Sequence, residues 1–211
     1  MARLSWGSAG ERFFETGIDR GVLYLPSQPG VPWIGLVAVN EQPNGGEAQP
    51  YYIDGIKYAN VALAEEYEAT LSALSAPAEF GPCDGVAQIH NGLLATHQPR
   101  VPFSLSYRTL VGNDLEGAQH GYKIHLVYNA LAEPTQRVNV TQGKSAAPMA
   151  LSWKLSTLPP SITGYKRTAH LVVDSRYTDP EVLAEVEDVL YGTDIEAPSI
   201  PTPDELIAIF A

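Results

Sequence analysis

Two segments near the middle of the chain alternate strictly between apolar and polar positions. In residues 103–109, Phe, Leu, Tyr and Thr alternate with Ser, Ser and Arg, and residues 122–129 alternate in a similar way. A period of two is typical of a strand with one buried face, so the pattern predicts two half-buried strands. The link between them is longer than a tight hairpin needs, and we expect a protruding loop over residues 111–121.

Shorter patterns predict further strands on both sides of this pair. Residues 149–157 and 168–174 read as strands, and an Asp-Gly pair at Asp54-Gly55 between β-forming residues predicts a hairpin. Residues 1–50 are rich in glycine and proline, and their apolar runs are short. The runs at residues 22–25 and 34–39 predict short strands joined by exposed loops, in a loop-rich N-terminal region that can pack on a neighbour as an arm.

Two helices are predicted near the C-terminus, at residues 178–192 and 203–210. The first has a cap at Thr178 or Asp179, Pro180 in its first turn and Gly192 at its end. These are the residues expected at helix boundaries. The second repeats the start signal and ends in apolar residues.

Residues 63–75 fit either a helix or a strand. Leu63, Tyr67, Leu71 and Leu74 form a stripe at helical spacing, and the helix propensity is high. The segment also alternates in a period of two, with Tyr67, Ala69, Leu71 and Ala73 on one side and Glu66, Glu68, Thr70 and Ser72 on the other. Strand is slightly favoured because so many strands surround the segment.

A long connection follows at residues 76–102, with a short helical turn expected around residues 77–80. Connections of this length are usually functional or interfacial. Together these elements predict a β-rich α+β fold: one domain over residues 1–211, with an antiparallel β-sandwich or partial barrel flanked by a helix, long loops and an N-terminal arm.

The charge and the single cysteine exclude several classes of protein. The chain has 24 acidic and 13 basic residues and a net charge of −11, which argues against binding DNA or an anionic membrane. Cys83 is the only cysteine, so a disulfide within the chain and a cysteine-rich metal site are excluded. No apolar run reaches the length of a membrane span and no signal core follows Met1, so we expect a protein made inside a cell.

The chain carries little that predicts chemistry. No phosphate-binding loop and no nucleophile elbow is present, and no family signature surrounds Cys83. His120 and His125 would face opposite sides of one strand, whereas His125 and His170 could meet across adjacent strands. For the histidines, a position at the surface or at an interface is favoured over a role as metal ligands. We therefore expect no catalytic residue, no metal and no cofactor, and a hydrolase with a carboxylate pair stays as a rival.

Several blocks of the sequence resemble major tail proteins of long-tailed, non-contractile phages of actinobacteria. They are RLSWGSAGERFFETGIDRGVLYLP at the start, YYIDGIKYAN, the segment FSLSYRTLVGNDLEGAQHGYKIHLVYNALAEP, ITGYKRTAHLVVDSR, and IPTPDELIAIF near the end. The resemblance covers nearly the whole chain.

The resemblance implies a structural virion protein of the tail tube. Such proteins form hexameric rings that stack into a hollow conduit for DNA, and loops and termini bridge successive rings. The implied partners are other copies of the chain, a tape measure protein inside the tube, and tail terminator and distal tail proteins at its ends. Double-stranded DNA would pass without specific binding, no membrane is involved, and assembly takes place in the host cytoplasm.

Two groups of residues are candidates for roles in such a tube. The loop over residues 111–121 is a candidate assembly element, with Gly112, Asn113, Asp114, Gly117 and His120, and the loop over residues 81–102 is its rival. Ser104 and Ser106 are candidates for a wet lumen, whose lining we expect to be neutral to negative. The alternative function is a β-sandwich binding module of the tail tip that recognises a carbohydrate or a receptor.

Overall fold

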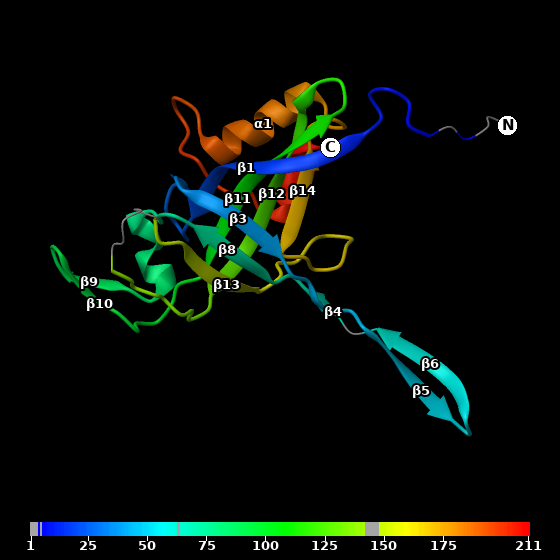
Figure 1. Ribbon diagram of the computed structural model, residues 1–211, viewed down its shortest axis with the longest axis horizontal. Helices are drawn as coiled ribbons and strands as arrows, with labels where there is room; N and C mark the ends of the chain where they lie inside the picture. The colour runs from blue at the N-terminus through cyan, green and yellow to red at the C-terminus, as the bar shows by residue number, and fades with distance from the viewer. Residues whose placement is uncertain (1–3, 5, 63, 142–147) are drawn as a thin grey trace.

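The computed structural model describes residue 4 and residues 6–62, 64–141 and 148–211. Its body is one eight-stranded antiparallel sheet with strand order β2-β1-β11-β12-β13-β8-β3, and β14 also pairs with β12. The sheet is curved and open, and α1 lies across one of its faces (Figure 1). The strands of this sheet are β1 (Phe13–Tyr24), β2 (Val31–Pro32), β3 (Leu36–Glu41), β8 (Ala69–Ala73), β11 (Phe103–Asn113), β12 (Gly117–Ala132), β13 (Leu151–Thr157) and β14 (His170–Asp174).

The remaining elements are short hairpins and helices. Two-stranded pairs are formed by β4 (Asn44–Gly45) with β7 (Glu65–Glu66), β5 (Ala48–Ile53) with β6 (Ile56–Ala62), and β9 (Ala87–His90) with β10 (Leu93–Ala95). The helices are the 3-10 helix η1 (Ala78–Asp84), α1 (Pro180–Tyr191) and α2 (Pro203–Ile209). The β-rich α+β class predicted from the sequence is confirmed, as an open sheet rather than a closed barrel.

The central strands β11 and β12 have a hydrophobic core on each face. The concave core includes Phe80, Leu105, Tyr107 and Trp153, packed between the central strands, η1, β8 and β13. The opposite core lies under α1 and α2 and contains Tyr24, Ile124, Leu126, Tyr128, Val186, Leu190 and Leu206. Alternate residues of one strand therefore enter different cores, and the predicted half-buried strands are buried on both sides.

Capping residues define both helices as the sequence predicts. The Asp179 side chain accepts a hydrogen bond from the Glu181 backbone N–H, and Gly192, with φ of 80°, ends α1. In α2, Thr202 and Glu205 form a capping box in which each side chain accepts from the other's backbone N–H. These caps satisfy backbone N–H groups that no helical bond can reach.

The predicted loop over residues 111–121 is wrong. β11 continues to Asn113 and β12 begins at Gly117, so only three residues form the turn. Most of the residues expected to form this loop instead extend the antiparallel pairing of β11 and β12, with a register shift between Val111 and Asn113. The N-terminal region also holds more regular structure than predicted, because β1 is a 12-residue strand paired with β11.

The ambiguous segment 63–75 contains strand β8 at Ala69–Ala73, so the strand alternative is confirmed; Leu63 lies outside the described residues. β8 is an interior strand of the sheet and pairs with both β13 and the end strand β3. Ala69, Leu71 and Ala73 are fully buried, and this tertiary burial overrides the helix propensity.

Candidate assembly surfaces

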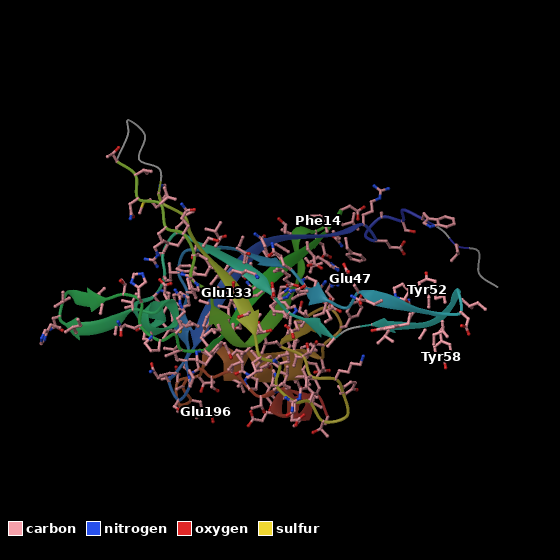
Figure 2. All side chains as sticks on the ribbon, turned by 90° about the horizontal axis from the view of Figure 1, so that it is seen from below. Phe14, Glu47, Tyr52, Tyr58, Glu133 and Glu196 are labelled. Carbon is pink, nitrogen blue, oxygen red and sulfur yellow. The ribbon has the colours of Figure 1, made fainter. Side chains whose placement is uncertain are left out.

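The β5–β6 hairpin extends far from the body of the protein (Figures 1 and 2). Asp54 and Gly55 form its two-residue turn with φ values of 51° and 77°, which confirms the predicted hairpin. Every strand residue is exposed except Ala59, which is half-buried. The exposed residues include large apolar ones: Tyr51, Tyr52, Ile53, Ile56, Tyr58 and Val61.

This exposure is unusual because it affects both faces of the hairpin. Tyr51 and Tyr52 are neighbours on one strand, and both are more than half exposed. Successive strand residues point to opposite faces, so each face presents apolar surface to solvent. A lone two-stranded hairpin is marginally stable in water. Exposed apolar residues on both faces of a hairpin are expected in a segment that becomes ordered when it packs against a partner.

A second exposed hairpin lies at the opposite end of the molecule. In both views β9–β10 points away from the β5–β6 hairpin (Figures 1 and 2). Ile89, Leu93 and Leu94 are each more than half exposed on it. The hairpin lies within the segment 81–102, the second candidate for an assembly element. Because the hairpin projects from the body, this segment remains a candidate.

The N-terminal segment lies on the same side of the body as the β5–β6 hairpin (Figure 1). Leu4 and Trp6 are 76% and 84% exposed. The described residues before β1 (residue 4 and residues 6–12) form no strand, whereas residues 13–24 of the expected N-terminal arm form β1.

The β11–β12 turn holds this arm in place. The Gly10 backbone N–H donates to the Asp114 carboxylate at 3.0 Å. The Asn113 side chain accepts from the backbone N–H of Glu116 at 2.6 Å, and His120 lies 2.8 Å from the Glu116 carboxylate. The candidate residues Gly112, Asn113, Asp114, Gly117 and His120 thus come together around a compact turn. Their role in assembly stays a prediction.

The expected lumen position of Ser106 is wrong for this structure. Ser106 is fully buried, and its hydroxyl lies 3.1 Å from the Tyr24 hydroxyl beneath α1. Ser104 is half-buried on the same face, and its hydroxyl accepts from the Asn129 backbone N–H. These serines bond to neighbouring groups under the helix layer, and a wet channel cannot reach Ser106 there.

Three ligand-type side chains meet at one edge of the concave core. Glu41 ends β3, His125 lies on β12 and His170 begins β14. His125 Nδ1 is 3.1 Å from His170 Nε2 and 3.5 Å from Glu41 Oε1, and His170 Nε2 is 3.8 Å from the same oxygen. His125 and His170, which the sequence allows to meet across adjacent strands, do lie together, but the expectation of a surface or interface histidine is wrong for His125, which is buried.

Burial favours the neutral form of both imidazoles. Desolvation lowers the pKa of His125 to about 4, and it also lowers the pKa of His170. The Glu41 carboxylate acts in the opposite direction and accepts a hydrogen bond from the Tyr107 hydroxyl at 2.8 Å. Glu41 is the residue of this cluster that sequence analysis missed, because its separation from both histidines follows no motif.

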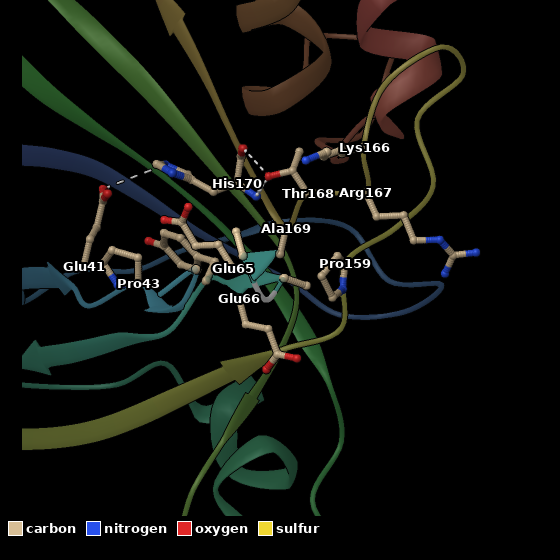
Figure 3. Close-up of a pocket in the computed structure, with 14 residues that line it drawn as sticks. Glu41, Pro43, Glu65, Glu66, Pro159, Lys166, Arg167, Thr168, Ala169 and His170 are labelled. Atoms are coloured by element: carbon tan, nitrogen blue, oxygen red, sulfur yellow. Dashed lines mark hydrogen bonds and ion pairs between the residues drawn. The ribbon is translucent and has the colours of Figure 1, made fainter. Parts of the chain in front are cut away.

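The cluster lies at the wall of an open groove. Figure 3 shows Glu41 and His170 facing each other there. The groove has a volume of about 960 Å³, and its lining also includes Glu65, Glu66, Lys166 and Arg167. The charges of its lining are mixed, with carboxylates on one side and two cationic side chains in the segment before β14.

Cys83 has no reactive surroundings. It is fully buried in η1, and burial raises the pKa of its thiol to about 12. The thiol is therefore protonated and packs as a small apolar group. In the described part of the chain, no helix is long and apolar enough to cross a membrane.

No protein-family model matches this chain, and a search of curated proteins found no match. Among solved structures, the chain is similar to one in the cryo-electron microscopy structure of the anti-feeding prophage baseplate, 6-fold symmetrised. The two are 10% identical with a TM-score of 0.39, over 81% of this chain and 97% of the other. Similarity at this level does not establish a shared fold.

Proposed function

We propose that this chain is a structural protein of a phage tail that polymerises with copies of itself into stacked hexameric rings, the tube through which DNA is delivered. The observation that carries the proposal is the pair of exposed apolar hairpins at opposite ends of the molecule. Because several blocks of its sequence resemble major tail proteins, the assembly we propose is a tail tube.

The positions of the two hairpins at opposite ends of the molecule determine which kind of contact they can make between copies of the chain. A surface at one end that binds a different surface at the other end is a heterologous contact, which produces rings or open filaments. Apolar patches of this kind on a soluble protein mark interaction sites. The occupant we propose for the β5–β6 hairpin is therefore a second copy of this chain.

The open sheet supports lateral contacts in the same assembly. In the described residues, the strand order ends at β2 on one side and β3 on the other. Edge strands carry unpaired backbone groups that invite pairing with a neighbouring chain. A closed ring of subunits removes such edges.

The acidic charge suits a conduit for DNA. A net charge of −11 disfavours binding to a polyanion. In this proposal DNA passes without specific binding, and a tape measure protein, a terminator and a distal tail protein complete the tail. The chain assembles in the host cytoplasm, belongs to the virion and performs no catalytic step.

Electron microscopy with hydrogen exchange tests the proposal. We expect rings or tubes from the purified protein at high concentration, and slow exchange of the backbone amides of residues 48–62 in the assembled fraction only. In the dilute monomer these amides should exchange rapidly, because a lone hairpin opens readily. A protein that stays monomeric or trimeric and binds a carbohydrate saturably would instead be a tail-tip binding module.

A further inference from the structure

We infer that Glu41, His125 and His170 form a binding site for one divalent transition-metal ion of the zinc type. The proposal goes beyond the assembly function and rests on the geometry of the three side chains. Each offers one ligand atom, and these atoms all lie within 4.8 Å of one another.

The distances between the ligand atoms match those around a tetrahedral ion. Zinc binds nitrogen and oxygen at about 2.0–2.2 Å, which places neighbouring ligand atoms roughly 3.3–3.6 Å apart. The three separations in the cluster are 3.1, 3.5 and 3.8 Å. Shifts of a few tenths of an ångström would place all three atoms in the first coordination shell. Two imidazoles and one carboxylate form a ligand set used by zinc and by iron.

Neighbouring side chains hold the ligands in the orientation that a metal requires. His125 Nε2 lies 3.0 Å from Thr109 Oγ1, so a proton on Nε2 leaves Nδ1 with its lone pair facing the cluster. The Tyr107 hydroxyl donates to Glu41 and orients the carboxylate. Such partners of the ligands are a regular feature of metal sites.

An unsatisfied polar atom lies next to the cluster. The Tyr67 ring packs 4.7 Å from the His170 ring, and its buried hydroxyl lies beside the Tyr107 hydroxyl but makes no well-aligned hydrogen bond among the described residues. The groove lined by Glu41, Tyr67 and His170 gives solvent access to the site and leaves room for a water molecule as fourth ligand.

A metal here would connect parts of the chain that are distant in sequence. Glu41 is on β3, an end strand of the sheet, whereas the histidines are on β12 and β14. An ion bound only by the folded chain raises the free energy of unfolding by an amount that grows with the logarithm of the free ion concentration divided by Kd. The inferred role is to fix the end strand β3 against the central strands.

The same side chains also permit an arrangement without metal. His170 Nε2–H can donate directly to His125 Nδ1 at 3.1 Å, and the pair then needs no ion. The two arrangements differ in whether the protein takes up one equivalent of metal with a defined affinity.

The experiment uses the full-length protein, freed of any histidine tag and stripped with a chelator. Zinc is titrated against a chromophoric competitor, and cobalt is added separately because its visible spectrum reports the coordination geometry. We expect one equivalent of zinc per chain and a tetrahedral cobalt spectrum. At a hundredfold excess of zinc over Kd, the thermal midpoint should rise by about 5 °C or more.

Two variants that each change one ligand and one control variant locate the site. Glu41→Gln keeps an acceptor for Tyr107 but removes the charge, and His170→Gln removes one nitrogen ligand. Each should weaken zinc binding by more than about 10-fold, the loss that removal of an outer-shell partner alone can cause. His90→Gln changes an exposed histidine on β9 and should bind zinc as the unchanged protein does. If the protein takes up no zinc or cobalt, or if Glu41→Gln and His170→Gln bind as tightly as His90→Gln, the proposal is overturned.

Discussion

The Tyr24 hydroxyl lies 3.1 Å from Ser106 Oγ and donates to the Leu190 carbonyl oxygen at 2.8 Å. One side chain of β1 thereby bonds to both β11 and the last turn of α1. The Leu190 carbonyl is one of the helix-end acceptors that cannot receive an intrahelical bond. The contact is buried, so water does not replace it when it is lost.

Replacing Tyr24 by Phe should therefore destabilise the fold. The change keeps the ring but leaves the Leu190 carbonyl and the Ser106 hydroxyl without this partner. We expect the free energy of unfolding to fall by about 1–3 kcal/mol in urea denaturation, the usual cost of a buried unsatisfied group.

Tyr128→Phe is the matched control. Its hydroxyl is also buried on the α1 side, but it has no hydrogen-bond partner among the described residues. Removing it should change the stability by less than about 0.5 kcal/mol or increase it. Equal losses in the two variants would contradict a specific role for the Tyr24 bonds.

A second prediction concerns acid. Arg108 donates to both oxygens of Asp19 at 2.7 and 2.6 Å, and this ion pair lowers the pKa of the Asp19 carboxyl. The unfolded chain then binds a proton at higher pH than the folded chain does. The stabilisation is complete above the ordinary aspartate pKa of about 4 and is lost as the pH falls through the lower folded value.

Asp19→Asn should remove this contribution. Because the Asp19 side chain is 38% exposed, solvent screening limits the expected loss at pH 7 to about 1 kcal/mol. The difference from the unchanged protein should narrow at pH 3. Asp194→Asn, at an exposed position between α1 and α2, should follow the unchanged protein at both pH values. A constant difference between Asp19→Asn and the unchanged protein across pH would refute the prediction.

A third prediction concerns the β11–β12 turn. A Cβ atom on Gly112 would lie 2.4 Å from the Gly117 carbonyl oxygen and 2.5 Å from the Phe14 ring. Gly112→Ala should therefore force β1 and the turn apart and cost about 1–3 kcal/mol in thermal or urea unfolding. At Gly81 the nearest atom is 3.7 Å away, so Gly81→Ala should be close to neutral. Similar stability of the two variants would show that this turn yields easily.

The sequence predicted those elements whose signals are local. Asp54-Gly55 alone determines the turn of its hairpin, and Asp179 and Thr202 cap the helices through contacts within three residues. The strand at residues 69–73 was ambiguous because its pairing with β3 and β13 is invisible in the local pattern.

The sites depend on contacts between distant residues, and these escaped prediction. Ser106 looked solvent-facing because a serine alternates with apolar residues, yet its partner Tyr24 is 82 positions away. Glu41 meets His125 and His170 only when the sheet curves. One signal was present but unused: adjacent apolar residues at Tyr51 and Tyr52 are incompatible with a hairpin that has one solvated face.

The last prediction tests whether the hairpin contact is heterologous. Tyr52 and Tyr58 are 64% and 75% exposed on the β5–β6 hairpin, and Figure 2 shows both pointing away from it. The double variant Tyr52→Ser and Tyr58→Ser should fold, because neither residue belongs to a core, and it should not form tubes alone. Its other surfaces are intact, so it can still bind the growing end of a normal tube. Once bound it presents a defective hairpin, and growth at that end stops. A small fraction of the variant mixed with unchanged protein should therefore shorten the tubes measured by electron microscopy. Tyr165→Ser, an equally exposed tyrosine outside the hairpins, should leave their length unchanged. If the double variant forms normal tubes alone, or is incorporated into tubes of unchanged protein without shortening them, the β5–β6 hairpin is not the contact between successive subunits.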